Sequence, residues 1–195
     1  ASLIVSYSMP VWLAVVVGLA LGALLGAING ALISIAGIPP FIATLGTMTA
    51  VRGLTYVYTG GYPVYGLPSE FAWLGAGYVA GIPVPTILMF IVAIAAYFLL
   101  TRTPFGRSVY AIGGNEEAAR LSGIRVVRSK VLVYTVTGLL AAMSAIVLAS
   151  RLRSGLPTAG NMYELNAIAA VILGGTSISG GQGGVLGTLF GALFM

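Results

Sequence analysis

Residues 101–130 read TRTPFGRSVYAIGGNEEAARLSGIRVVRSK and form the longest polar stretch of a strongly apolar chain. The whole sequence is 58% hydrophobic and only 7% charged, yet this stretch holds six of the nine basic residues and two of the four acidic ones. Apolar segments long enough to cross a bilayer flank it on both sides. The fold is therefore expected to depend on a charged segment that connects two membrane-crossing helices.

The composition indicates an all-α, polytopic membrane protein. A soluble domain usually carries about a quarter charged residues, whereas this chain has few charges and a mean hydropathy of +1.04. It has no Cys and no His, which removes thiol chemistry and the commonest metal ligand and proton shuttle. We expect no catalytic residue, metal site or cofactor. The net charge of +5 is interpreted as a signal of membrane orientation rather than of nucleic-acid binding.

The apolar segments predict a series of helices, some of them broken. The expected segments are 11–35, 41–59, 85–100, 131–149, 166–173 and 185–195. The last two are short and are separated by GGTSISGGQGG at 174–184. Broken helices are tolerated in membranes only where the free backbone is buried in protein or lines a cavity, so they are typical of transport pathways. The chain starts without Met and stops inside a short apolar segment; residues 1–195 are expected to be part of one longer transmembrane domain.

Charge asymmetry predicts the orientation. Short loops rich in Lys and Arg stay on the cytoplasmic side, which places 101–130 inside. Residues 36–40 have no charge of their own and are expected on the same side, consistent with that orientation. Residues 60–83 contain no Lys or Arg and are expected outside, as a loop or partly helical lid. Residues 150–165 are also expected outside, although Arg151 and Arg153 oppose the rule there.

Two features of the first segments indicate how their helices are surrounded. Glycines at positions 18, 22, 26 and 30 recur every four residues on one helix face, a spacing that lets helices approach closely in lipid. Arg52 lies inside the second segment, where a charge is costly unless it faces protein or water. Contact of Arg52 with a polar cavity and pairing with a carbonyl or carboxylate both stay open.

Residues 116–122 are predicted to form a short capped helix within the polar stretch. Asn115 is a good N-cap, Glu116 and Glu117 suit the positive end of the helix dipole, and Gly123 is a natural stop. Gly113-Gly114 is expected to form a sharp turn before it. A helix of about two turns is marginal alone in water, so it requires a groove on a partner or on its own domain. An interfacial helix lying on anionic headgroups is the open alternative.

Four blocks of sequence resemble the permease subunits of ribose-, galactoside- and xylose-type ABC sugar importers, in the family's order. The string GGNEEAARLSGI (113–124) resembles the cytoplasmic coupling-helix signature of these permeases. In chain order the four blocks are FIATLGTMTAVRGL (41–54), VYTGG (57–61), TPFGRSVYAIGGNEEAARLSGI (103–124), which contains this signature, and PTAGNMYELNAIAAVILGGTSISGGQGG (157–184). The resemblance covers about residues 11–195, and PTAG at 157–160 favours the ribose-like branch. Asn166 stands where the family pattern has Asp.

The resemblance implies a multi-helix permease bundle that imports a ribose-like monosaccharide across the bacterial inner or plasma membrane. It also implies a cytoplasmic ATP-binding subunit, an extracytoplasmic sugar-binding protein and a second permease copy, identical or related. The permease would hold no nucleotide, which agrees with the absence of GxxxxGK[ST]. Membrane lipid is the remaining expected partner.

Three groups of residues are candidates for function. A neutral sugar needs hydroxyl or amide groups along its path, although each such side chain has the alternative of bonding back to its own helix. Arg151 and Arg153 have the alternative of pairing with Glu164. The coupling candidates are Asn115, Glu116, Glu117, Arg120, Leu121 and Gly123. The pathway candidates are Asn29, Thr44, Thr47, Asn166, Thr176 and Ser177, and the candidates for docking the binding protein are Glu70, Arg151 and Arg153.

Other classes of function leave different signatures in sequence. An ion-coupled secondary transporter or channel needs buried acids or His, and the segments offer only Glu164 near one end. An intramembrane enzyme needs His, Cys, paired carboxylates or a metal cluster. The secondary transporter or channel is the main alternative; a scaffold without transport is disfavoured by the broken helices.

Overall fold

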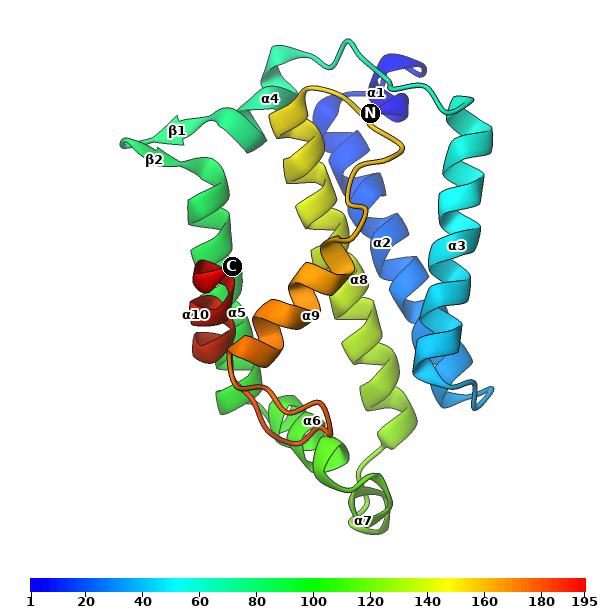
Figure 1. Cartoon of the computed structure of the whole chain (residues 1–195), viewed down its shortest axis with the longest axis vertical. Coiled ribbons are helices and arrows are strands. Elements are labelled where there is room, and N and C mark those ends of the chain that lie inside the picture. Colours follow the sequence, from blue (N-terminus) through cyan, green and yellow to red (C-terminus); the bar gives the residue numbers. More distant parts are fainter. The chain divides into compact units, whose positions relative to one another are not determined.

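A computed structural model describes residues 1–195 as an almost entirely helical chain (Figure 1). The helices are α1 (Ser2–Val5), α2 (Val11–Ser34), α3 (Pro40–Thr59), α4 (Ser69–Ala76), α5 (Val84–Arg102), α6 (Pro104–Gly114), α7 (Glu116–Leu121), α8 (Val126–Leu152), α9 (Tyr163–Leu173) and α10 (Val185–Phe194). A two-residue hairpin of β1 (Tyr78–Val79) and β2 (Ile82–Pro83) is the only sheet. The expected all-α class is confirmed.

The three helices α2, α5 and α8 are long and apolar enough to cross a membrane. Helix α3 has 20 residues, sufficient length for a crossing, but it is less apolar because it carries Arg52 and five threonines. All five hydroxyls donate to the carbonyl four residues earlier, at 2.8–2.9 Å. These bonds satisfy the threonine hydroxyls within the helix.

The chain divides into two compact units. Unit 1 comprises residues 1–87 and 131–159, and unit 2 comprises residues 88–130 and 160–195. Few apolar side chains are buried in either, and many large ones are exposed. Such exposure is expected where the outer faces of helices contact lipid rather than water.

Unit 1 is held together by contacts of α8 with α2 and with α4. A methyl group added at Gly22 or Gly26 of α2 would overlap α8, at Gly138 and Ala142 or at the backbone of Tyr134 and Thr135. The two backbones therefore touch, as expected from the four-residue glycine spacing. Helix α4 packs on the end of α8, where the fully buried Ser150 hydroxyl donates to the carbonyl of Phe71.

Unit 2 contains α6 and α7 and a helical hairpin of α9 and α10. A methyl group added at Gly191 would overlap the Ala170 carbonyl, and one at Gly174 would overlap the backbone of Gly187. The hairpin is therefore in backbone contact along its length. Residues 174–184 connect its two helices as the glycine-rich loop, which reaches α6 (Figure 1).

Most expected helices are confirmed, with shifted ends. The break at 36–39 lies between α2 and α3, and α7 ends one residue earlier than expected. Helix α8 begins at Val126 and ends at Leu152, so the last basic residues of the polar stretch are helical. The expected lid at 60–83 is partly helical through α4. Helix α9 begins at Tyr163 rather than Asn166.

The expected turn at Gly113-Gly114 is wrong. Both glycines lie in the last turn of α6, and neither has a positive φ. Helix α6 forms because Thr103 caps it, accepting a bond from the Gly106 amide at 3.2 Å, and Pro104 occupies its first position. Proline is favoured there because its missing N–H would be unpaired anyway.

Candidate functional site

Asn115 defines the junction between α6 and α7. Its backbone amide donates to the Ala111 carbonyl at 3.1 Å, closing α6. Its side-chain oxygen accepts from the Ala118 amide at 2.9 Å, opening α7. This confirms the expected N-cap. Because one residue closes one helix and opens the next, α6 and α7 are joined without a flexible linker.

The end of α7 is closed as the sequence predicts. The Gly123 amide donates to the Arg120 carbonyl at 3.0 Å, and Gly123 has a φ of +83°. Glycine adopts this left-handed conformation without steric cost, so it is the usual residue beyond a helix end. The Ile124 amide then bonds the Ala119 carbonyl at 3.1 Å. Helix α7 is thus restrained at both ends.

Glu116 ties α7 to the start of α8. One carboxylate oxygen accepts from the Lys130 ammonium at 2.6 Å, and the other lies 3.5 Å from Arg120. The hydrogen bond from Lys130 holds the pKa of Glu116 below its ordinary value of 4.5, against a smaller opposing effect of desolvation. The carboxylate therefore stays ionised at neutral pH. Exposure to solvent weakens such pairs by screening.

Helix α7 has one inner residue and an exposed face. Ala119 is buried, with 4% of its surface exposed. Glu117, Arg120 and Leu121 are exposed, and Leu121 shows 85% of its surface. An exposed leucine therefore lies beside two opposite charges on a helix outside the apolar segments.

The pathway candidates fall into two groups, one in each unit. In unit 1 the Thr47 hydroxyl donates to the Asn29 side chain at 2.6 Å and to the Ala43 carbonyl at 2.8 Å, linking α3 to α2. Thr44 bonds only its own helix, at the Pro40 and Phe41 carbonyls. In unit 2 Thr176 and Ser177 belong to the glycine-rich loop, and Asn166 is exposed on α9.

The docking candidates lie on elements of unit 1 that touch each other. Glu70 is in the first turn of α4, and Arg151 is in the last turn of α8. A methyl group added at Gly75 of α4 would overlap the backbone of Arg151. Arg153 lies two residues after Arg151, just beyond the end of α8, and all three charged side chains are exposed. The alternative of pairing with Glu164 stays a prediction, since that residue belongs to unit 2.

Sequence reasoning missed two contributors to the site. Lys130 was expected only as part of the basic stretch, and Tyr110 was given no role. Tyr110 donates its hydroxyl to the Gly183 carbonyl at 2.9 Å. The signal for α6 itself was the Thr103-Pro104 pair, a cap followed by proline. No local pattern points to the Tyr110 bond, because its partner lies 73 residues away.

Comparison with known proteins supports the expected resemblance. Residues 1–195 match the family described as "Branched-chain amino acid transport system / permease component". The ribose import permease protein RbsC of Bacillus subtilis (strain 168) is 54% identical over 197 residues, covering 100% of this chain and 61% of the relative. RbsC of Escherichia coli (strain K12) is 48% identical over 199 residues, covering 100% and 62%. The D-allose transport system permease protein AlsC of the same strain is 42% identical over 181 residues, covering 93% and 54%.

The chain spans about three fifths of the length of the ribose permeases that it matches. No solved structure matches it. The match to the family covers every residue, and three of the helices are long and apolar enough to cross a membrane. The chain therefore belongs to the family of branched-chain amino acid transport system permease components.

Proposed function

We propose that the chain is part of the permease subunit of an ATP-driven importer for a ribose-like monosaccharide in the bacterial inner or plasma membrane. Helix α7 carries this proposal, because it is a short helix closed at both ends that presents Leu121 to a partner. Relatives named as ribose import permeases, at 48–54% identity, support the class of sugar.

The proposed mechanism is mechanical. ATP binding closes two cytoplasmic ATP-binding subunits, and α7 occupies a groove on one of them. Leu121 is the apolar anchor, and Glu117 and Arg120 make the polar contacts around it. Movement of the groove displaces α7, and α7 displaces the helices on either side of it. The permease itself then needs no nucleotide site.

Rigidity of α7 is the physical requirement of this mechanism. A helix that frays absorbs displacement instead of transmitting it. Asn115 and Gly123 restrain the two ends, and the Glu116–Lys130 bond at 2.6 Å ties α7 to α8. Glu116 accordingly acts as an internal brace as well as a residue of the coupling helix.

The outer end of unit 1 is the proposed docking surface for an extracytoplasmic sugar-binding protein. Glu70, Arg151 and Arg153 are exposed there on neighbouring elements. Charges of both signs at one surface favour a partner with complementary charges, and they raise the rate of encounter more than the affinity. A second permease copy would complete the importer.

The Asn29–Thr47 pair is the best-supported pathway candidate in unit 1. An amide and a hydroxyl lie together between two helices, and both are half-buried. Such groups offer a neutral sugar hydrogen bonds without a charge. The remaining candidates also have hydroxyl or amide side chains, but fewer contacts support a shared site for them. They are Thr44, Asn166, Thr176 and Ser177.

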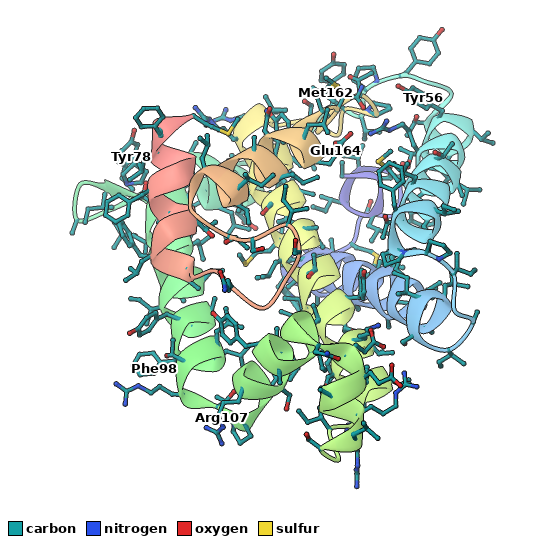
Figure 2. The ribbon with its side chains drawn as sticks, turned by 60° about the horizontal axis from the view of Figure 1, so that its bottom comes forward. Tyr56, Tyr78, Phe98, Arg107, Met162 and Glu164 are labelled. Carbon is teal, nitrogen blue, oxygen red and sulfur yellow. The ribbon has the colours of Figure 1, made fainter.

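The test uses the full-length permease with its ATP-binding subunit and sugar-binding protein in proteoliposomes. We expect Glu117→Lys and Leu121→Ala to lower ATP-dependent sugar uptake at least about tenfold, the loss typical of truncating an interface anchor. Arg107→Ala is the matched control, because Arg107 is exposed and extends away from α6 (Figure 2). Unchanged uptake in both variants would contradict the coupling role.

The alternative function, ion-coupled secondary transport, is tested in the same vesicles. If the permease alone, without the ATP-binding subunit, accumulates sugar when an ion gradient is imposed, it is a secondary transporter. We expect uptake instead to need ATP, and to persist when ionophores collapse the ion gradients. Competition by unlabelled ribose, allose and xylose then ranks the sugars.

A further inference from the structure

The glycine-rich loop touches the last turn of α6 backbone to backbone. A methyl group built on Gly113 would lie 2.5 Å from the Gly181 nitrogen and 3.1 Å from its Cα atom. From the other side, a methyl group on Gly180 would lie 2.7 Å from the Gly113 oxygen. Real Cβ atoms essentially never approach other atoms closer than 3.0 Å. Glycine on both sides is therefore what permits the contact.

Tyr110 strengthens the same contact one turn earlier in α6. Its hydroxyl donates to the Gly183 carbonyl at 2.9 Å. This bond joins α6 to the loop at a second point. Tyr110 and Gly113 thus contact the loop about one helical turn apart, which restrains sliding of α6 along the loop.

The loop is closed on itself by hydrogen bonds between its own residues. The Ser177 amide donates to the Gln182 carbonyl at 3.0 Å, and the Gly180 amide donates to the Ser177 carbonyl at 3.1 Å. The Ser177 hydroxyl accepts from the Ser179 amide at 3.2 Å. Because α9 and α10 are themselves in backbone contact, the loop and its two helices form one body.

We propose that α6 and the glycine-rich loop form a rigid connection that carries displacement of α7 to the α9–α10 hairpin, with Tyr110 and Gly113 as its positioning residues. The connection runs from α7 through Asn115 into α6, and from α6 into the loop that holds Thr176 and Ser177. All of these residues belong to unit 2. The inference rests on the proposed function, because α7 moves only if a partner moves it.

Two neighbouring glycines provide the test and its control. A methyl group on Gly113 overlaps the loop, whereas one on Gly114 meets nothing within 4 Å. Both glycines lie in the same helical turn, so alanine changes helix propensity equally at the two positions. In the full-length transporter we expect Gly113→Ala to lower sugar uptake per ATP hydrolysed about tenfold, within the usual range of coupling between sites. Gly114→Ala is expected to stay within about twofold of the wild type, as for most surface substitutions.

Tyr110→Phe is the milder variant, which keeps the ring and removes one hydrogen bond. We expect it to lower uptake per ATP about threefold, consistent with the modest net free energy of one bond. Its ATP hydrolysis and its assembly with the ATP-binding subunit are expected to stay normal. A purely structural role for Tyr110 would instead lower assembly and leave the uptake-to-ATP ratio unchanged.

Spin labels supply a direct readout of the connection. The 195 residues contain no Cys, so Arg107→Cys on α6 and Ile178→Cys in the loop are the only labels in this part of the permease. Both native side chains are exposed, Ile178 by 85%. We expect the distance between the two labels of one copy to be narrow and the same with and without ATP, and to be broader in Gly113→Ala.

The outcomes separate the two proposals. If the wild type shows no ATP-dependent uptake, the proposed function fails. If the wild type couples ATP to uptake while Gly113→Ala and Gly114→Ala behave alike, only this inference fails. A label distance that changes with ATP in the wild type also overturns it, since the loop and α6 would then move separately. That measurement decides the matter if Gly113→Ala does not assemble.

Discussion

At the scale of single residues, Glu116 makes contacts that the sequence does not predict. Its position in the first turn of α7 predicts a favourable contact with the helix dipole. The structure adds hydrogen bonding to Lys130 and proximity to Arg120. One carboxylate thus joins two helices that are separated by a short linker. Glu117, beside it in sequence, makes no ion pair.

The lowered pKa of Glu116 predicts a pH dependence of α7. Since the folded pKa lies below the ordinary value of 4.5, the ionised carboxylate stabilises folded α7 at pH values above 4.5. This contribution is lost as the pH falls through the folded pKa. We expect amide exchange protection of residues 118–121, measured in nanodiscs and corrected for intrinsic rates, to fall in that acidic range.

Two variants test the assignment of this step to Glu116. Glu116→Gln is expected to show low protection at every pH, without the acidic step. Glu117→Gln is the control and is expected to keep the step, because Glu117 makes no ion pair. High salt should reduce the protection of the wild type, since the pair is partly exposed and screened. A step that survives in Glu116→Gln would assign it to another group.

The Asn29–Thr47 contact also depends on single side chains. The Thr47 hydroxyl has one proton, which serves both the Asn29 oxygen and the Ala43 carbonyl. The expected alternative, bonding back to its own helix, therefore accounts for only part of what Thr47 does. For Thr44 it accounts for both of its contacts. Of these two threonines, three residues apart, only Thr47 bonds a side chain of another helix.

At the scale of elements, contact between α2 and α8 depends on glycine. Every fourth residue from Gly18 to Gly30 is glycine, but the positions are not equivalent. A methyl group on Gly26 would overlap the Tyr134 carbonyl, whereas one on Gly18 would lie 3.4 Å from Ile146, an ordinary contact. Packing in lipid gains from such close approach because it has no help from the hydrophobic effect.

Gly26→Ala is therefore expected to destabilise unit 1, and Gly18→Ala is the matched control. Overpacking a close contact typically costs about 1–3 kcal/mol, while alanine in a helix interior gains about 0.5–1 kcal/mol over glycine. We expect a lower Tm in detergent for Gly26→Ala, and an equal or higher one for Gly18→Ala, by fluorescence-detected size exclusion after heating. Equal losses at both positions would contradict backbone contact at Gly26.

Helices α6 and α7 show what local sequence patterns do and do not predict. For α7 the cap, the acidic first turn and the terminal glycine agree, and the helix lies within one residue of its expected ends. For α6 the signal of Thr103-Pro104 competes with a pair of glycines at 113–114, which favour a turn in isolation. Those glycines are nonetheless helical, and the loop at Gly180 and Gly181 packs against them. The local preference for a turn therefore did not decide their conformation.

At the scale of the whole molecule, the orientation in the membrane is the central expectation. The positive-inside rule places α7 on the cytoplasmic side and residues 60–83 on the other. Contact of the glycine-rich loop with α6, both within unit 2, adds that this loop lies on the side of α7. The sequence alone did not assign a side to that loop.

Accessible cysteines test this orientation in intact cells. Tyr65→Cys is expected to react with a membrane-impermeant maleimide from outside, and Leu121→Cys only after permeabilisation. The native side chains are both exposed, by 66% and 85%, so access from the correct side is not limited by burial. Ile178→Cys is expected to follow Leu121→Cys. Labelling of Leu121→Cys in intact cells would overturn the coupling role of α7.

The sequence by itself determined the helical class, the positions of the long spans and the capped α7. These features depend on hydrophobic length and on bonds between residues three or four apart, which a linear pattern contains. Only the tertiary structure decided which glycines serve close contact, that Lys130 holds Glu116, and that Tyr110 reaches Gly183 across 73 residues. The reason is physical: a glycine or a tyrosine has the same local preferences wherever it stands, and only the backbone that approaches it gives it a partner.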